Sequence, residues 1–274
     1  MAHFTTSDSL SLYYSDEGEG LPILCLAGLT RTTADFDDVT PHLAGHRLIK
    51  MDYRGRGQSD FDPNWQNYTL PVECRDVLEL LDHLSVAQVA ILGTSRGGMN
   101  AMGLAASAKD RLLGVALNDV GPVLDPKGLA VIMTYLGRNP AAKTHAEAAA
   151  ALAFVFPEFE DVPPERWLRE AQKNFVQTAQ GLQITYDPHL RDAVEAAMAQ
   201  DEIDLWPFFD ALEGLPLALI HGASSSLLRD DTVTEMQRRR PDLILGRVPG
   251  RGHVPFLDEP EAVAALRAWL EKIA

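Results

Sequence analysis

A serine stands at the centre of a pattern that can support nucleophilic chemistry. Residues 93–97 read Gly-Thr-Ser-Arg-Gly, after an apolar run at 89–92 and before a helix-like stretch at 99–106. A strand that turns sharply into a helix holds the central serine in a strained conformation, and small residues two positions away let both elements approach. The hydroxyl then projects at a helix start, where backbone amides favour negative charge. This G-x-S-x-G spacing predicts that Ser95 is a nucleophile.

A base for that serine is expected at His253, near the end of the chain. Residues 250–255 read Gly-Arg-Gly-His-Val-Pro, between an expected strand at 243–248 and a final helix at about 260–273. A glycine-flanked loop at this place can carry an imidazole back over the sheet. Neutral imidazole would take the serine proton and later deliver it to a leaving group.

The elements that must position these two residues alternate between strands and helices. This alternation predicts a mostly parallel sheet with helices on both faces. It breaks at residues 122–214, which are alanine-rich and helical, punctuated by proline, with no convincing strand. We therefore predict a core made of residues 1–121 and 215–274, split by a helical cap at 122–214. The cap should lie over the carboxyl ends of the strands and enclose an apolar pocket. The short strands are expected at residues 4–6, 10–14, 23–26, 47–51, 89–92, 112–117, 217–220 and 243–248.

Composition narrows the class of protein. The 274 residues include 39 acidic and 24 basic side chains, for a formal charge of −15. This balance argues against nucleic acid and anionic membranes as partners. Cys25 and Cys74 are expected to be buried free thiols, and no signal peptide or long apolar run is evident, so a cytoplasmic location is expected. No group of side chains has metal-ligand spacing, so no metal is expected.

Six segments together resemble the capped α/β-hydrolase superfamily, and its bacterial esterase-like members in particular. The resemblance implies an α/β-hydrolase fold with an eight-stranded sheet, a triad of serine, acid and histidine, and hydrolysis without a cofactor. It also implies an oxyanion hole made by two backbone amides, those of Leu29 and Arg96. The segments are residues 28–31, 52–59, 93–98, 117–122, 206–210 and 252–255.

The acid of the triad is where this chain departs from the family. In that family, the loop after the strand that follows the cap commonly resembles Gly-x-x-Ser-Asp-Leu-Leu and carries the acid. In this chain the loop is residues 222–228, and Ser226 occupies the aspartate position. Three alternatives stay open. The acid is Asp119, at the end of an earlier strand; or Ser226 is an inactivating change; or Asp230 or Asp231 reaches in, although both are expected to begin a helix.

Other polar residues have a functional and a structural interpretation. The Arg96 side chain could bind a substrate carboxylate, but we expect a salt bridge with an acid of the cap, Asp187 among them. Residues 52–59 are expected to form a structural loop with Asp52 paired to its arginines. His221, at a strand end near the site, is expected to be structural.

The sequence thus predicts a serine hydrolase acting on a small or medium carboxylic ester or a lactone through an acyl-enzyme. Ser95, His253 and Asp119 would form the triad. Two alternatives remain: hydrolysis of a carbon–carbon bond in a diketone, and a catalytically impaired homologue that binds ligands because Ser226 replaces the usual acid. The expected partner is a small ester-like molecule, and the chain is compatible with a homodimer.

Overall fold

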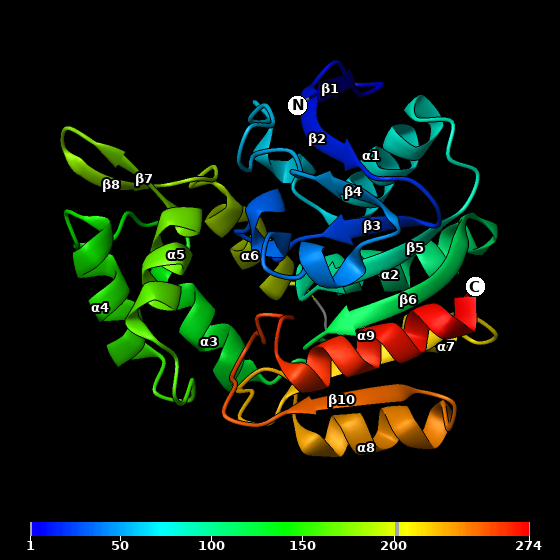
Figure 1. Ribbon diagram of the computed structural model, residues 1–274. Coiled ribbons are helices and arrows are strands. Elements are labelled where there is room, and N and C mark those ends of the chain that lie inside the picture. The colour runs from blue at the N-terminus through cyan, green and yellow to red at the C-terminus, as the bar shows by residue number, and fades with distance from the viewer. Residues whose placement is uncertain (1, 201–202, 274) are drawn as a thin grey trace.

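An eight-stranded sheet organises the molecule, as the computed structural model shows for residues 2–200 and 203–273 (Figure 1). The strand order is β1-β2-β4-β3-β5-β6-β9-β10. The first two pairings, β1 with β2 and β2 with β4, are antiparallel, and the other pairings are parallel. This confirms the predicted fold class. The strands are β1 (Ala2–Thr5), β2 (Ser11–Glu17), β3 (Pro22–Leu26), β4 (Arg47–Met51), β5 (Val89–Thr94), β6 (Leu112–Asn118), β9 (Leu217–Gly222) and β10 (Ile244–Val248).

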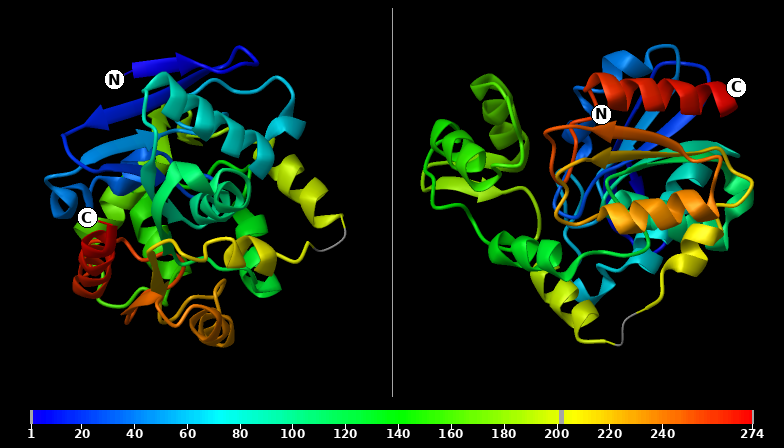
Figure 2. Two further views of the ribbon diagram at one scale, coloured as in Figure 1. Left: turned by 90° about the vertical axis from the view of Figure 1, so that its right-hand side faces the viewer. Right: turned by 90° about the horizontal axis from the view of Figure 1, so that it is seen from below.

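Helices cover both faces of the sheet because its central strands are apolar on both sides. In β3, Leu24 and Leu26 belong to one buried cluster and Ile23 and Cys25 to the other, following the alternation of a strand. Helices α1, α2 and α8 pack on the first cluster and α9 on the second, and Figure 2 shows α8 and α9 on opposite faces. The helices are α1 (Leu70–His83), α2 (Arg96–Ser107), α3 (Pro126–Tyr135), α4 (His145–Val155), α5 (Pro164–Asn174), α6 (Leu190–Met198), α7 (Trp206–Asp210), α8 (Asp230–Arg239) and α9 (Pro260–Ile273).

Residues 122–214, which we call the cap segment, contain α3 to α7 and a small hairpin. Helices α3, α4 and α5 lie to one side of the sheet in Figure 1. The expectation of no strand here was wrong, since β7 (Phe175–Thr178) pairs antiparallel with β8 (Gly181–Ile184). Strands of four residues are too short to show an alternating pattern, and the Ala-Gln turn between them lacks the usual glycine signature.

The end of the cap segment returns to the core. Phe209 of α7 and the nearby Leu212 are both fully buried, in the same cluster as Leu24 and Leu26 of β3. Both cysteines are free and buried as expected, and burial raises the pKa of each thiol to about 12.

Candidate active site

The turn between β5 and α2 has the conformation that its sequence demands. Ser95 has φ of 50° and ψ of −111°, a strained backbone at the point where strand becomes helix. A Cβ atom added to Gly93 would lie 2.6 Å from the carbonyl carbon of Gly97, and one added to Gly97 would overlap the carbonyl oxygen of Leu26. Only glycine fits at these two positions, so the spacing has a steric cause.

Three residues far apart in sequence form one hydrogen-bond chain. Ser95 Oγ lies 3.0 Å from Nε2 of His253, and Nδ1 of that ring lies 2.8 Å from Oδ2 of Asp119. Asp119 follows β6 directly, has a φ of 53° and is fully buried. This arrangement can pass a proton from the serine hydroxyl to the imidazole, with a fixed carboxylate beside the charge that forms.

The carboxylate of Asp119 accepts four hydrogen bonds. Oδ2 accepts from His253 and from the Ser225 hydroxyl at 2.6 Å, while Oδ1 accepts from the Gly222 amide at 2.9 Å and from Nδ1 of His221 at 3.1 Å. Burial alone would raise the pKa of this carboxyl, but hydrogen bonds from the two histidines and the serine hold it below its ordinary value. The group is therefore an anion at neutral pH.

His221 is a contact of the site that sequence reasoning did not assign. Its Nε2 atom lies 3.2 Å from Oδ1 of Asp230, so the ring bridges two carboxylates. An ionised carboxylate can only accept a hydrogen bond. Both ring nitrogens of His221 can therefore donate at the same time only when each of them carries a proton. His221 is near the end of β9, at the same edge of the sheet as Asp119. Its position at a strand end was the sequence feature that could have predicted this contact.

The other acid candidates lie elsewhere. Ser226 is exposed and makes no hydrogen bond to the described residues; the serine that faces Asp119 is its neighbour Ser225. Asp230 contacts His221 but not His253, and Asp231 pairs with the Arg229 side chain.

Two backbone amides near Ser95 have no hydrogen-bond acceptor among the described residues. A Cβ atom on Gly28 would lie 3.8 Å from Cβ of Ser95, so this loop runs close to the serine. The amides of Leu29 and Arg96 donate to no acceptor among residues 2–200 and 203–273. The Arg96 amide belongs to the first turn of α2, whose donors have no partner within the helix.

The Arg96 side chain is bound away from the cap segment. Its Nε atom lies 2.8 Å from the buried Glu73 carboxylate of α1, so the expected pairing with a cap acid was wrong. Asp187 instead accepts a hydrogen bond of 2.6 Å from the Tyr68 hydroxyl. Helices α1 and α2 pack together, which brings Glu73 within reach of the first turn of α2.

The loop at 52–59 is structural, but its pairing differs from the expectation. Asp52 accepts hydrogen bonds from the Thr33 and Gln58 amides rather than from arginine. The buried guanidinium of Arg54 instead binds acids from outside the loop, with Asp76 at 2.7 Å. Asp52 therefore connects the backbone at Thr33 with the backbone at Gln58, while Arg54 connects the loop to α1.

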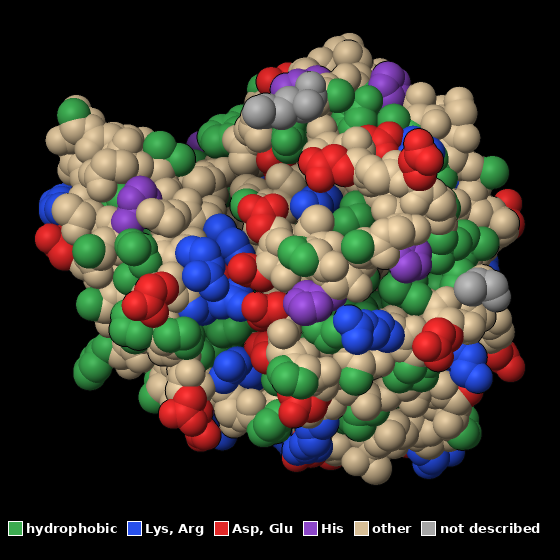
Figure 3. Space-filling view, viewed as in Figure 1, with side chains coloured by type: hydrophobic (Ala, Val, Ile, Leu, Met, Phe, Trp, Pro, Cys, Tyr) green, Lys and Arg blue, Asp and Glu red, His purple; other side chains and the backbone are tan. Residues whose placement is uncertain are grey.

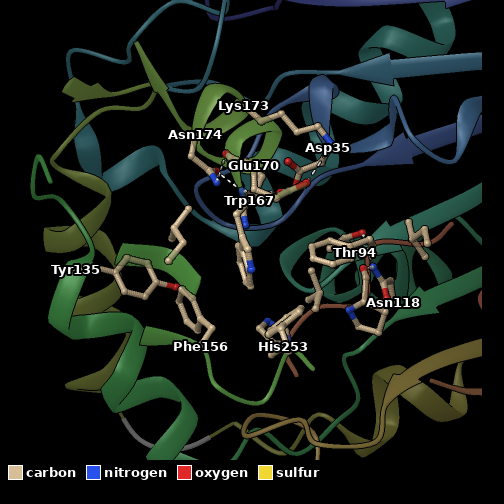
Figure 4. Close-up of a pocket in the computed structure, with 17 residues that line it drawn as sticks. Asp35, Thr94, Asn118, Tyr135, Phe156, Trp167, Glu170, Lys173, Asn174 and His253 are labelled. Atoms are coloured by element: carbon tan, nitrogen blue, oxygen red, sulfur yellow. Dashed lines mark hydrogen bonds and ion pairs between the residues drawn. The ribbon is translucent and has the colours of Figure 1, made fainter. Parts of the chain in front are cut away.

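A cavity opens between the cap segment and the residues around His253 (Figure 4). It contains about 730 Å³ of empty space, part of it open to solvent. Figure 4 shows Asp35, Glu170, Lys173 and Asn174 together on one wall and Tyr135 and Phe156 on another, while Trp167 projects from the side of Glu170 toward His253. The polar wall consists of Arg31, Asp35, Glu170, Lys173 and Asn174, and the aromatic residues include Tyr135, Phe156, Phe159 and Trp167.

Comparison with known proteins gives a consistent classification. The family model described as "alpha/beta hydrolase fold" matches residues 22–260. The chain therefore belongs to the α/β-hydrolase family. It is 36% identical over 260 residues to a 3-hydroxybutyrate-oligomer hydrolase of Cupriavidus necator, covering 92% of this chain and 88% of the relative.

Other relatives extend this similarity. An α/β hydrolase of Novosphingobium aromaticivorans, known from a crystal structure, superposes with a TM-score of 0.92 at 36% identity and covers 99% of each chain. A 2-(acetamidomethylene)succinate hydrolase of Mesorhizobium japonicum is 24% identical over 264 residues, covering 94% of this chain and 90% of that one. Within the described part of the chain, no cluster of histidine, cysteine and acidic residues could hold a metal, and no helix has the length and apolarity to span a bilayer.

Proposed function

We propose that this protein is a serine hydrolase that cleaves a carboxylic ester through an acyl-enzyme. The observation that carries the proposal is the continuous hydrogen-bond chain from Ser95 through His253 to Asp119. In the first step, Ser95 Oγ attacks the ester carbonyl while Nε2 of His253 takes its proton. The amides of Leu29 and Arg96 stabilise the oxyanion, and the imidazolium protonates the departing alkoxide. Water, activated by the same ring, then releases the acid and restores Ser95.

The class of ester follows from the pocket and from the relatives. The cavity places aromatic side chains opposite a polar wall, so it suits a short carbon chain that carries a polar group. A relative that is 36% identical is named for hydrolysis of 3-hydroxybutyrate oligomers, which are esters of this kind. Short hydroxy-acid esters and lactones therefore belong in the first substrate panel.

The ligand-binding alternative depended on a missing acid, and the contact between Asp119 and His253 argues against it. Asp119 supplies a buried carboxylate to His253, and Ser226 is not required for that purpose. Hydrolysis of a carbon–carbon bond uses the same kind of triad, so a diketone is included in the panel as the competing substrate.

Labelling combined with turnover tests the proposal. The wild type should react with a fluorophosphonate probe at Ser95 and hydrolyse p-nitrophenyl acetate. Ser95→Ala should abolish both, whereas the exposed serine variant Ser226→Ala should retain both. Labelling that persists in Ser95→Ala, or a wild type that neither labels nor turns over, contradicts the proposed nucleophile. Turnover of the diketone without turnover of any ester contradicts the ester specificity.

A further inference from the structure

Arg31 faces the cavity and approaches the same glycine as the proposed nucleophile. A Cβ atom built on Gly28 would lie 3.4 Å from Cγ of Arg31 and 3.8 Å from Cβ of Ser95. The aliphatic part of Arg31 and the Ser95 side chain therefore both lie next to Gly28, and the Arg31 guanidinium lines the polar wall. Asp35 follows four residues later and lines the same wall.

The Arg31 and Asp35 side chains leave hydrogen-bonding capacity open. Nε of Arg31 is 3.7 Å from Oδ2 of Asp35, and Nη1 is 3.8 Å from Glu170, both longer than a hydrogen bond. The Arg31 guanidinium donates one side-chain hydrogen bond among the described residues, from Nη1 to Asn174. The Asp35 carboxylate accepts none from them, although only 14% of this side chain is exposed. A donor and an acceptor thus lie side by side at the cavity.

The charges on this wall favour a neutral ligand group over an anion. Arg31 and Lys173 are balanced by Asp35 and Glu170, and Lys173 also donates to Asp38 at 2.6 Å. A carboxylate entering here would meet two acidic side chains in a chain whose formal charge is already −15. A hydroxyl can instead accept from the guanidinium and donate to the carboxylate.

We propose that the Arg31–Asp35 pair binds a hydroxyl group on the acyl chain of the substrate, so that hydroxy-substituted esters are preferred over their unsubstituted analogues. The inference rests on the proposed function and adds the residues that select the substrate. The carbon chain packs against the aromatic side chains that line the cavity, Tyr135 and Phe156 on one side and Trp167 above His253. Discrimination follows because an ester without the hydroxyl leaves the half-buried Arg31 donor and Asp35 acceptor without a ligand partner.

The protonation of Asp35 gives the pair a pH signature. Burial raises the pKa of Asp35 to about 6, with further increases from Glu170 and Asp37, while Arg31 and Lys173 act in the opposite direction. The ionised carboxylate is the stronger acceptor. The preference for the hydroxy ester should therefore weaken as the pH falls below 6, whereas a site for carboxylates would strengthen there.

The test compares p-nitrophenyl 3-hydroxybutyrate with p-nitrophenyl butyrate. Because the two substrates share a leaving group, the ratio of their kcat/KM values cancels any common loss of rate. The wild type should favour the hydroxy ester, and Asp35→Ala and Arg31→Met should each lower the ratio about tenfold or more. Arg138→Met, which changes an exposed arginine of the cap segment, should leave the ratio unchanged.

Several results would overturn the inference. They are a wild-type ratio near one, a ratio that neither variant lowers, and preference for a p-nitrophenyl hemisuccinate over both esters. Failure of the proposed function is recognised separately, as absent turnover of both esters. In that case binding of ethyl 3-hydroxybutyrate and ethyl butyrate to Ser95→Ala is measured by calorimetry, and equal affinity for the two contradicts hydroxyl recognition.

Discussion

The Asp119 carboxylate lies 2.8 Å from Nδ1 of His253, although the two residues are 134 positions apart in the chain. Asp119 follows β6, and His253 comes from the loop between β10 and α9. Among the described residues, Asp119 is the acid within hydrogen-bond distance of that ring. This relationship gives the proposed triad its acid at an earlier strand than the family pattern implied.

Replacement of this acid by its amide should abolish most of the activity. Asp119→Asn removes the negative charge that stabilises the His253 imidazolium and disturbs the ring's tautomer. By analogy with a triad acid changed in the same way, kcat on p-nitrophenyl acetate should fall about 10⁴-fold. Circular dichroism should show a folded variant. A kcat within tenfold of the wild type would rule out Asp119 as the acid.

Restoring an aspartate at the usual family position should bring no gain. Ser226 is exposed and makes no hydrogen bond to the described residues, and the site beside His253 is filled by Asp119. Ser226→Asp should therefore keep kcat/KM within about threefold of the wild type, measured with the same ester. A large increase would mean that the chain had lost its acid and that Asp119 does not serve in its place.

The sequence predicted most of the elements that hold the site, but not its polar contacts. Ser95 and His253 could be singled out because glycine spacing and strand order are local features. Asp119 remained one of three alternatives, since choosing it required knowing that β6 ends beside the histidine loop. The partner of Arg96 was missed for the same reason: Glu73 reaches it through the packing of α1 on α2, which no local pattern encodes.

His221 should position Asp119 for catalysis. The ring lies between the carboxylates of Asp119 and Asp230, and Arg247 in turn lies 2.8 Å from Asp230. His221→Gln removes the contact of 3.1 Å between Nδ1 and Oδ1 of Asp119, while the Gly222 amide and the Ser225 hydroxyl still hold that carboxylate. The kcat on p-nitrophenyl acetate should therefore fall several-fold, roughly the loss of one hydrogen bond and far less than in Asp119→Asn.

A second variant separates this positioning role from a purely structural one. Asp230→Asn alters the contact of Nε2 and leaves the contact of Nδ1 with Asp119, so its kcat should stay closer to the wild type than that of His221→Gln. If both variants lower the melting temperature but leave kcat unchanged, His221 serves only to hold the β9 end.

The two cysteines should resist modification in the native protein. Burial raises the pKa of both the Cys25 and Cys74 thiols to about 12, so almost no thiolate forms at pH 8. Ellman's reagent should react with neither thiol of the folded protein over minutes and with both after unfolding in guanidinium chloride. Rapid release of one equivalent of chromophore from the native protein would contradict the buried environment of these residues.

The contact between α5 and the core should control access to the cavity. Asp38 forms ion pairs with Arg166 at 2.7 Å and with Lys173 at 2.6 Å, both on α5. Figure 3 shows acidic and basic side chains next to one another where the cap segment meets the core. Asp38→Asn removes the anion shared by Arg166, Arg169 and Lys173, which leaves Arg166 paired with Asp258 and Lys173 with Glu170. The cap segment should loosen, and KM should rise several-fold with a smaller change in kcat.

Salt provides the matching measurement for Asp38. Because these pairs are partly exposed, screening at 1 M sodium chloride should raise the wild-type KM toward the value of the variant. The KM of Asp38→Asn should respond less, since its anion is already gone. Asp37→Asn, which alters an exposed neighbour 3.6 Å from Lys50, serves as the control and should resemble the wild type at both salt concentrations. An equal salt response in all three proteins would show that these ion pairs do not hold the cap segment in place.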